Sequence, residues 1–401
     1  MTCSSQRHLS RGLVWLMSAA TGLAVAGNYY AQPLLPVISA EMKLSAAAAG
    51  VIVTTAQAGY ALGLWLIVPL GDVFERRRLI VLMMLLAACG LLICALSDGF
   101  SGLLLGTAMA GVCSVVAQLL VPFAATLAPA HERGRVIGTV TSGLLLGILL
   151  ARTAAGALAG IGSWHTIYWT GAACLLAMAA LLATCLPSHQ QSAGLSYPRL
   201  LASVLQLLRD EPVLRQRTLL GACSFASFSV LWTSIAFLLA APPFGFSSPV
   251  IGLLGLVGAA GALAAPLIGR LGDRGQGRRA THIALWFLLL SWLVLYWARA
   301  SFAALLPAVV LLDLAVQVVH ISNQAEIYQL RPEARNRLAS AYMTCLFIGM
   351  AAGSLASASA YEFAGWSGVV AVGLLVSVAG LLVWLRARRV TPAALCADAI
   401  D

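Results

Sequence analysis

Twelve apolar stretches of transmembrane length decide what this chain can fold into. A helix of about 20 residues crosses the roughly 30 Å hydrocarbon core of a membrane, and lipid supplies no partner for an exposed backbone. The chain is 61% hydrophobic and 9% charged, which excludes an ordinary soluble globular protein. We therefore expect an all-α membrane protein with twelve transmembrane helices. The stretches cover residues 12–38, 46–70, 79–97, 101–128, 136–159, 165–186, 218–241, 248–271, 281–298, 302–326, 338–360 and 366–385.

The cations fall almost entirely on one side of this arrangement. Of the 24 Lys and Arg residues, 21 lie in segments expected on one face, and only Lys43, Arg152 and Arg299 do not. Loops rich in Lys and Arg stay in the cytoplasm, so the bias predicts that both termini are cytoplasmic. The net charge of +10 is therefore a topology signal and not evidence for a nucleic-acid partner.

The first apolar run follows two arginines and reaches Ala26, a pattern that also occurs in cleaved signal peptides. The apolar character continues to Ile38, beyond the length of a signal core. Cleavage would also leave the first half of the chain one helix short of the second. We therefore expect an uncleaved first helix.

The two halves of the chain repeat one another. The segment Val68–Arg78 has a near-copy at Gly269–Arg279, and each contains Leu-Gly-Asp followed by a basic cluster. Repeats of this kind pack about an axis along the membrane normal, with a site near the midplane. Further pairs lie 202 positions apart: Arg133 and Arg335, Arg135 and Arg337, Gly147 and Gly349, and Trp164 and Trp366.

These repeats predict how the chain is divided. We expect a six-helix half over residues 1–186, a cytoplasmic linker over 187–217, and a second six-helix half with a short cytoplasmic tail over 218–401. The linker contains an amphipathic segment, Pro198–Arg209, that is typical of a helix lying on the inner membrane surface. The alternative is that this segment is only a tether that joins the halves.

The repeated loop and several other motifs resemble those of major facilitator superfamily transporters. The loop copies resemble that superfamily's signatures after the second and eighth helices, and Gly143–Gly156 resembles the helix-5 motif of its antiporter branches. With Asn28–Pro36 and His320–Tyr328, they are similar to a bacterial drug and sugar efflux branch. The resemblance implies a secondary transporter that works by alternating access, with proton-coupled export by antiport. Uptake by proton symport is the alternative, and a membrane sensor without transport is a more distant one.

The loop motif predicts a cytoplasmic gate. Acidic side chains at helix ends can pair with neighbouring arginines or cap a facing helix, and so hold the halves closed until they rock. The alternative is that these charges only fix topology. The gate residues are Asp72, Arg76, Arg77, Asp273, Arg278 and Arg279.

The tenth apolar stretch carries a polar stripe. Its members recur at i, i+4, i+7 and i+11, so they share one face of a helix, and we expect that face to line the central cavity. An ionisable group inside a membrane is costly, which favours proton or substrate handling over a purely structural hydrogen-bonded stripe. The stripe consists of Asp313, Gln317, His320 and Gln324. Asp313 lies roughly 17 Å below the outer end of its helix, near the midplane.

A second group of polar side chains lies in the first and fourth stretches. Asn28, Tyr29 and Gln32 suit recognition of a polar ligand, although they can also mark the outer end of the helix. Gln118 is the counterpart of His320 at an offset of 202. We expect these two side chains to face one another across the central cavity.

Arg152 is a cation placed inside the fifth stretch, among small residues that let a neighbouring helix approach. It lies roughly 25 Å along its helix from Arg135. One interpretation is that Arg152 snorkels to the outer surface. The other is a functional role, in which it pairs with an anionic ligand or, if the two helices meet, with Asp313.

The patterns of other protein classes are missing from the sequence. The one lysine does not follow a glycine, so there is no phosphate loop of an ATP-driven pump. No His-Glu-x-x-His or Gly-x-Ser-x-Gly motif indicates an enzyme, and the nine cysteines form no Cys-x-x-Cys pair. We expect no catalytic residue, cofactor or metal. The expected partners are a small-molecule substrate, protons and the lipid bilayer, and the expected state is a monomer.

Overall fold

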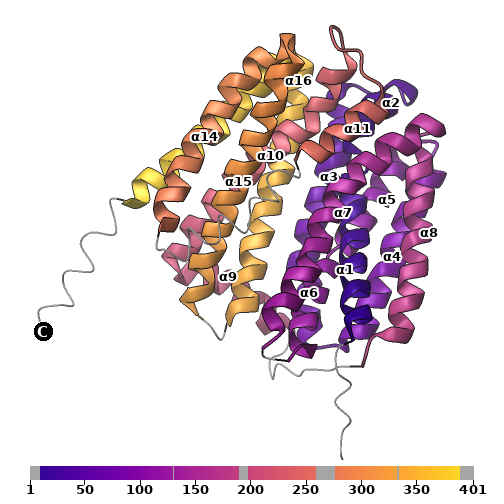
Figure 1. The fold of residues 1–401 in the computed structure, drawn as a ribbon, viewed down its shortest axis with the longest axis vertical. Helices are drawn as coiled ribbons and strands as arrows, with labels where there is room; N and C mark the ends of the chain where they lie inside the picture. Colours follow the sequence, from indigo (N-terminus) through magenta and orange to yellow (C-terminus); the bar gives the residue numbers. More distant parts are fainter. Residues whose placement is uncertain (1–9, 130, 189–196, 259–275, 332–333, 389–401) are drawn as a thin grey trace, which may run out of the picture.

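A computed structural model of the chain describes residues 10–129, 131–188, 197–258, 276–331 and 334–388. Within these ranges the secondary structure is entirely helical. Figure 1 shows two bundles side by side, the first coloured indigo to magenta and the second mainly orange to yellow. The first bundle contains α1 (Arg11–Ala26), η1 (Gly27–Tyr29), η2 (Gln32–Leu34), α2 (Leu35–Glu41), α3 (Ala46–Leu66), η3 (Val68–Asp72), α4 (Arg76–Leu96), α5 (Phe100–Cys113), α6 (Val116–Leu127), α7 (Arg133–Ile161) and α8 (His165–Cys185).

The second bundle follows a linker helix, α9 (Tyr197–Asp210), which is amphipathic as expected and buries Leu200, Val204 and Leu207. The Tyr197 hydroxyl donates a hydrogen bond to the Leu66 carbonyl oxygen at 2.7 Å, which attaches α9 to the end of α3. The second bundle contains α10 (Pro212–Ala240), α11 (Ser248–Val257), α14 (Gly277–Trp297), η5 (Ala298–Ala300), α15 (Phe302–Leu330) and α16 (Arg335–Arg388). Because α10 begins at Pro212, the last residues of the expected linker are already helical.

Nine helices in the described ranges are long and apolar enough to cross a membrane. One of them, α16, contains two expected spans, with a break at Gly365 where φ is 59° and ψ is −149°. A positive φ of this kind is readily adopted by glycine. The first expected span is divided into α1, two 3-10 turns and α2, and the eighth is described only through α11. The all-α membrane fold is confirmed, and the total of twelve spans stays a prediction.

Glycines allow close packing inside each bundle. A Cβ at Gly147 of α7 would overlap Gly22 of α1, and a Cβ at Gly349 of α16 would overlap the Ala222 carbonyl oxygen of α10. Lipid tails provide no hydrophobic force between helices, so small residues that bring backbones together are what such interfaces use. Gly147 and Gly349 are one of the pairs 202 positions apart, and each performs the same packing role in its own bundle.

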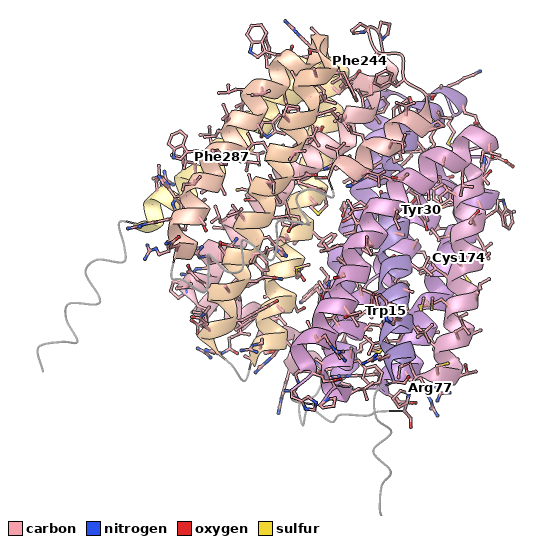
Figure 2. All side chains as sticks on the ribbon, in the orientation of Figure 1. Trp15, Tyr30, Arg77, Cys174, Phe244 and Phe287 are labelled. Atoms are coloured by element: carbon pink, nitrogen blue, oxygen red, sulfur yellow. The ribbon has the colours of Figure 1, made fainter. Side chains whose placement is uncertain are left out.

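The bundles have two distinct ends. Arg77 lies at the lower end in Figure 2, and Phe244 lies at the opposite end. We call the end that holds Arg76–Arg78 the arginine-rich end, and the other the far end. At the arginine-rich end a pocket of about 80 Å³ lies between η3 and α6 of the first bundle and α16 of the second.

Candidate functional site

The charged centre of the molecule joins the two bundles through one tryptophan. The Arg152 guanidinium carbon of α7 lies 3.9 Å from the centroid of the Trp232 ring of α10. The Trp232 indole Nε1 donates a hydrogen bond to Asp313 Oδ1 of α15 at 3.2 Å. Arg152 and Asp313 are only 3% and 4% exposed. The two opposite charges expected from the sequence thus contact one tryptophan, Arg152 over its ring and Asp313 at its indole N–H.

Arg152 does not snorkel to the surface, because side chains of both bundles hold it in the interior. Its Nε donates a hydrogen bond to Gln32 Oε1 at 2.7 Å. Its guanidinium carbon also lies 5.0 Å from the ring centroid of Tyr29 and 5.6 Å from that of Phe228. Aromatic faces attract a desolvated cation by up to about 2 kcal/mol, which partly offsets its burial. The structure therefore gathers Tyr29, Gln32 and Arg152 into one site.

The polar groups around Arg152 are incompletely paired. Among the described residues, Arg152 Nη2, Gln32 Nε2 and both amide atoms of Asn28 are buried and have no hydrogen-bond partner. Both amide atoms of Gln57 on α3 are also unpaired, a residue that our sequence analysis did not select. Buried polar groups are nearly always paired, so an unpaired group calls for an explanation, and a binding site is one.

Asp313 fits its place because of a glycine at the end of α11. A Cβ at Gly258 would lie 2.7 Å from Asp313 Oδ2. This distance is shorter than an ordinary contact, so any larger residue at position 258 would push the carboxyl group away. Gly258 therefore makes room for the carboxyl group of Asp313. Asp313 is expected from its own span alone, whereas nothing in the sequence pattern points to this glycine.

The remaining members of the α15 stripe lie in different surroundings. His320 Nδ1 is 3.1 Å from the Tyr342 hydroxyl, and its ring contacts the Phe225 ring edge-on. Gln317 and Gln324 are half-buried. Asp313 and His320 are thus held by different neighbours and do not form one continuous hydrogen-bonded stripe with the two glutamines.

A buried ion pair beyond His320 was not anticipated. Arg217 of α10, expected as a surface cation of the linker, is 3% exposed and pairs with Glu326 of α15. Its Nη1 donates to Asn323 Oδ1 at 3.2 Å, and Asn323 Nδ2 lies 3.4 Å from the Tyr342 hydroxyl. Asn323 and Glu326 are three positions apart on α15 and therefore share one face of the helix. A search for polar pairs at this spacing, outside the stripe from Asp313 to Gln324, could have found them.

Gln118 and His320 bind different partners. Gln118 Nε2 donates to the Tyr60 hydroxyl at 3.5 Å, while His320 contacts Tyr342. Gln118 also lines the pocket at the arginine-rich end. Among the described residues, no hydrogen bond joins Gln118 to His320, and their facing one another across a central cavity stays a prediction.

The charges of the first loop motif are paired inside their own bundle. Arg76 Nη2 lies 3.5 Å from Asp72 Oδ1, and Arg76 Nε donates to the Gly71 carbonyl oxygen at 3.3 Å. Arg77 Nη1 donates to the Leu186 carbonyl oxygen at 3.3 Å. Asp72 and Arg76 also line the pocket at the arginine-rich end, opposite α16. The first copy of the motif therefore borders the space between the bundles.

The second copy of the motif is only partly described. Asp273 lies outside the described residues, whereas Arg278 and Arg279 are exposed in the first turn of α14. Within the described ranges, no group of three His, Cys, Asp or Glu side chains is arranged to hold a metal ion.

Two helical bundles with a charged centre buried where they meet define the class of protein as a polytopic membrane protein. The family model of the Major Facilitator Superfamily matches residues 17–261 and 217–397. The chain belongs to this superfamily and is a membrane transporter, not an enzyme.

Relatives and solved structures agree with this assignment. The chain is 55% identical to the "Uncharacterized transporter YgaY" of Escherichia coli O157:H7, over 94% of this chain and 96% of that one. It is 35% identical to the "Probable transporter SCO4007" of Streptomyces coelicolor, over 89% and 83% of the two chains.

Two solved transporters share the fold at low sequence identity. A bacterial homologue of the human lysosomal transporter Spinster, in an inward-facing and occupied conformation, has a TM-score of 0.76 at 14% identity, covering 94% of this chain and 96% of that one. The nucleoside transporter NupG has a TM-score of 0.72 at 15% identity, covering 94% and 98%.

Proposed function

We propose that this transporter is driven by protons, that Asp313 is the group that takes the proton, and that the chain exports a small molecule by antiport. The observation that carries the proposal is the buried carboxyl group of Asp313, joined through Trp232 to the buried cation Arg152. A carboxyl group inside a membrane is costly, which favours a role in the transport cycle. One proton moved through 100 mV supplies about 2.3 kcal/mol, enough for roughly a fifty-fold gradient of a neutral substrate.

The proposed cycle uses the two expected halves, residues 1–186 and 218–401, as rocking units around the linker 187–217. Arg152 comes from the first half, and Trp232 and Asp313 come from the second. Rocking would therefore change the contact between Arg152 and Trp232, while the hydrogen bond from Trp232 to Asp313 stays within one half. In this way protonation of Asp313 and the conformation of the halves would influence one another.

Uptake by proton symport is the second candidate, and the charges of the site favour it. Arg152 and Asp313 offset one another, so a proton on Asp313 leaves Arg152 without a counter-charge. A ligand that neutralises Arg152 would then bind together with the proton, as symport requires. A ligand that neutralises Asp313 would compete with the proton, as antiport requires. Export is favoured by the resemblance of the loop and helix-5 motifs to efflux transporters.

The location and partners follow from the same proposal. We place the chain in a bacterial inner membrane, on the basis of its resemblance to bacterial efflux transporters, with both termini in the cytoplasm, on the basis of the one-sided arginines. The proposed partners are a small-molecule substrate, protons and the lipid bilayer, and the proposed functional unit is a monomer.

Transport by purified protein in vesicles of known orientation tests the function. A panel of drugs, sugars and amino acids is offered with an imposed proton gradient, and the direction of accumulation separates export from uptake. The Asp313→Asn variant keeps an oxygen that accepts from Trp232 but cannot exchange a proton. We expect it to bind substrate and to lose accumulation driven by the gradient. His320→Gln should shift the pH optimum if the histidine shares the proton.

Full gradient-driven accumulation by Asp313→Asn, with unchanged pH dependence, would remove Asp313 from the mechanism. Gln329→Asn, which changes an exposed side chain on the same helix, controls for general disturbance of α15. Binding without flux in any gradient would favour a sensor over a transporter with proton coupling.

A further inference from the structure

Arg76, Arg152 and Arg217 are buried arginines of the described residues, and they differ in their partners. Arg76 pairs with Asp72, and Arg217 pairs with Glu326. Arg152 has no carboxylate within ion-pairing distance among the described residues, although it is as buried as Arg217. Buried charges are normally paired, because removing a single charge from water is costly. Arg152 therefore has no anion in direct contact, and the carboxyl group of Asp313 is held at the indole Nε1 of Trp232.

The missing anion would belong on one edge of the guanidinium. Trp232, Tyr29 and Phe228 present their rings to the guanidinium, and its hydrogen-bond donors point outward in the guanidinium plane. Nε and Nη2 lie on the same edge, the arrangement that receives the two oxygens of a carboxylate. Here Nε donates to the neutral amide oxygen of Gln32, and Nη2 has no partner. Half of a two-oxygen site is thus unused.

The neighbouring unpaired groups are also mainly donors. Gln32 Nε2 belongs to the same amide that accepts from Arg152, so this donor lies beside the guanidinium. Asn28 lies four positions before Gln32, and its amide nitrogen is buried and unpaired as well. Arg152 Nη2 and Gln32 Nε2 are therefore two unpaired donors in one contact group, and the Asn28 amide is a further buried, unpaired group four positions earlier in the chain. Such a set is satisfied by a group rich in acceptor oxygens.

We propose that this centre binds the carboxylate of an organic monoanion, with Arg152 Nη2 and Gln32 Nε2 as its donors. Arg152 carries one positive charge, so a ligand with a single anionic group neutralises it when Asp313, which accepts from Trp232, is protonated. The aromatic side chains around Arg152 favour an organic anion with an apolar body over a small inorganic ion. The inference rests on the proposed transport site and names its substrate class. Of the two transport cycles, it fits proton symport, because an anion at Arg152 binds together with a proton on Asp313.

A carboxylate built into the protein provides the first test. Gln32→Glu is nearly isosteric and places an anionic oxygen at the position that accepts from Arg152 Nε. If an anion is missing, this variant should raise the Tm of the full chain in detergent by roughly 2–4 °C. Gln57→Glu, at a buried amide that is also unpaired, is the matched control and should lower the Tm. A Gln32→Glu protein no more stable than the parent would overturn the proposal.

Ligand binding provides the second test. Benzoate, phenylacetate and phenylpropionate are compared with their uncharged amides as stabilisers of the purified chain at millimolar concentration. We expect at least one acid, and not its amide, to raise the Tm, and we expect the effect to disappear in Gln32→Glu and Arg152→Gln. The effect should persist in Arg299→Gln, which removes an exposed arginine. Equal shifts from acids and amides, no shift from any acid, or a shift that survives Arg152→Gln would each refute the assignment.

These tests need no proton gradient. The anion site can therefore be rejected while the proposed function stands, and the reverse is also possible. Acid binding that depends on Arg152, without any proton-driven flux, would keep the anion site and reject proton-coupled transport. Flux of a neutral or cationic solute that depends on Asp313, without acid binding, would keep the transport proposal and reject the anion site.

Discussion

Gly50 and Gly252 lie 202 positions apart and make equivalent contacts between the bundles. Gly50 of α3 packs against Ala358 of α16, where a Cβ on the glycine would overlap the alanine Cβ. Gly252 of α11 packs against Gly156 of α7, where its Cβ would lie 3.0 Å from the Gly156 Cα. Gly156 and Ala358 are also 202 positions apart. The two interfaces are therefore related by the internal repeat, and both hold the bundles together beyond the charged centre, toward the far end.

The far-end interface predicts that Gly50→Ala opens the molecule at that end. The added methyl group has no space beside Ala358, and overpacking of this kind costs about 1–3 kcal/mol. The equilibrium between closed and open far ends should then shift roughly 5- to 150-fold toward the open form. Spin labels at the exposed Ala40 and Ser367 positions, in a protein without native cysteines, measure the separation of the bundles.

Gly138→Ala is the control for this change, because a Cβ at Gly138 meets nothing within 4 Å. It should leave the distance distribution unchanged. An unchanged distribution in Gly50→Ala as well would show that this contact does not hold the far end closed.

A carboxylate on one of the two equivalent interfaces predicts that the opening of the far end depends on pH. Glu362 Oε2 accepts a hydrogen bond from the Ala47 backbone N–H at 2.8 Å, across the two bundles. The counterparts of these residues, 202 positions away, are Gly160 and Pro249, which lack the carboxylate and the N–H. Only one interface therefore carries a titratable contact.

The pKa of Glu362 is lowered from its usual 4.5 by hydrogen bonds from the Ser45 hydroxyl and the Ala47 N–H. A lowered pKa means that the contact stabilises the closed far end above pH 4.5, and that this effect is lost as the pH falls through the lowered value. Glu362 lies between the two expected spans of α16, where it faces solvent. We expect acid to open the far end.

At neutral pH, the far end of Glu362→Gln should be as open as that of the parent protein in acid. The distance between the same two spin labels should then change less with pH than it does in the parent. Glu41→Gln, another exposed glutamate beside α3, should keep the response. If the far end of Glu362→Gln still opened in acid as in the parent protein, the group that titrates would be one other than Glu362.

Loss of the ion pair between the buried Arg217 and Glu326 should destabilise the protein more than loss of a pair whose arginine is more exposed. Glu326→Gln leaves a cation that is 4% exposed without its carboxylate. Breaking a buried pair costs about 3–5 kcal/mol, and we expect the lower value because the Glu326 side chain is 36% exposed. Glu211→Gln, which breaks the pair with the half-exposed Arg331, should cost about 1 kcal/mol or less. Denaturation in detergent compares the two, and equal losses would contradict the buried role of Arg217.

The loop motif predicts that Asp72→Asn reduces turnover more than substrate binding. Arg76 keeps its contacts with the Gly71 carbonyl oxygen and the Thr126 hydroxyl, so the fold should survive. The lost charge lies beside the space between the bundles, where it would act on their equilibrium and not on the substrate site. Asp273→Asn should behave alike, and Glu132→Gln, outside the motif, should be neutral. Equal losses of affinity and turnover would count against a gate.

The arginine distribution predicts that reporter fusions at residues 98 and 299 read periplasmic. Fusions beside Arg76–Arg78 and Arg278–Arg279 should read cytoplasmic, because cationic loops are retained there. A cytoplasmic reading at residue 98 or 299 would require a different assignment of spans.

The sequence by itself determined the class of fold, because a chain this apolar has few ways to satisfy its backbone in lipid. It also determined the repeat: Gly147 and Gly349, selected only by their spacing, perform the same packing role in the two bundles. Both conclusions depend on patterns spread over many residues, so an exception at any single position does not change them. The same evidence singled out Arg152, Gln32 and Asp313 as unusual residues inside apolar spans.

Only the tertiary structure decided which of these residues meet. Arg152 could have reached the outer surface, but the approach of α10 and α11 to α7 places Trp232 against its guanidinium. Arg217 was counted among the surface cations because its burial depends on Glu326 and Asn323, which are more than a hundred positions away. Helix periodicity gives the face of a single helix, whereas the partner of a buried charge depends on which helices pack together. That packing is set by contacts such as Gly50 with Ala358, between residues about three hundred positions apart.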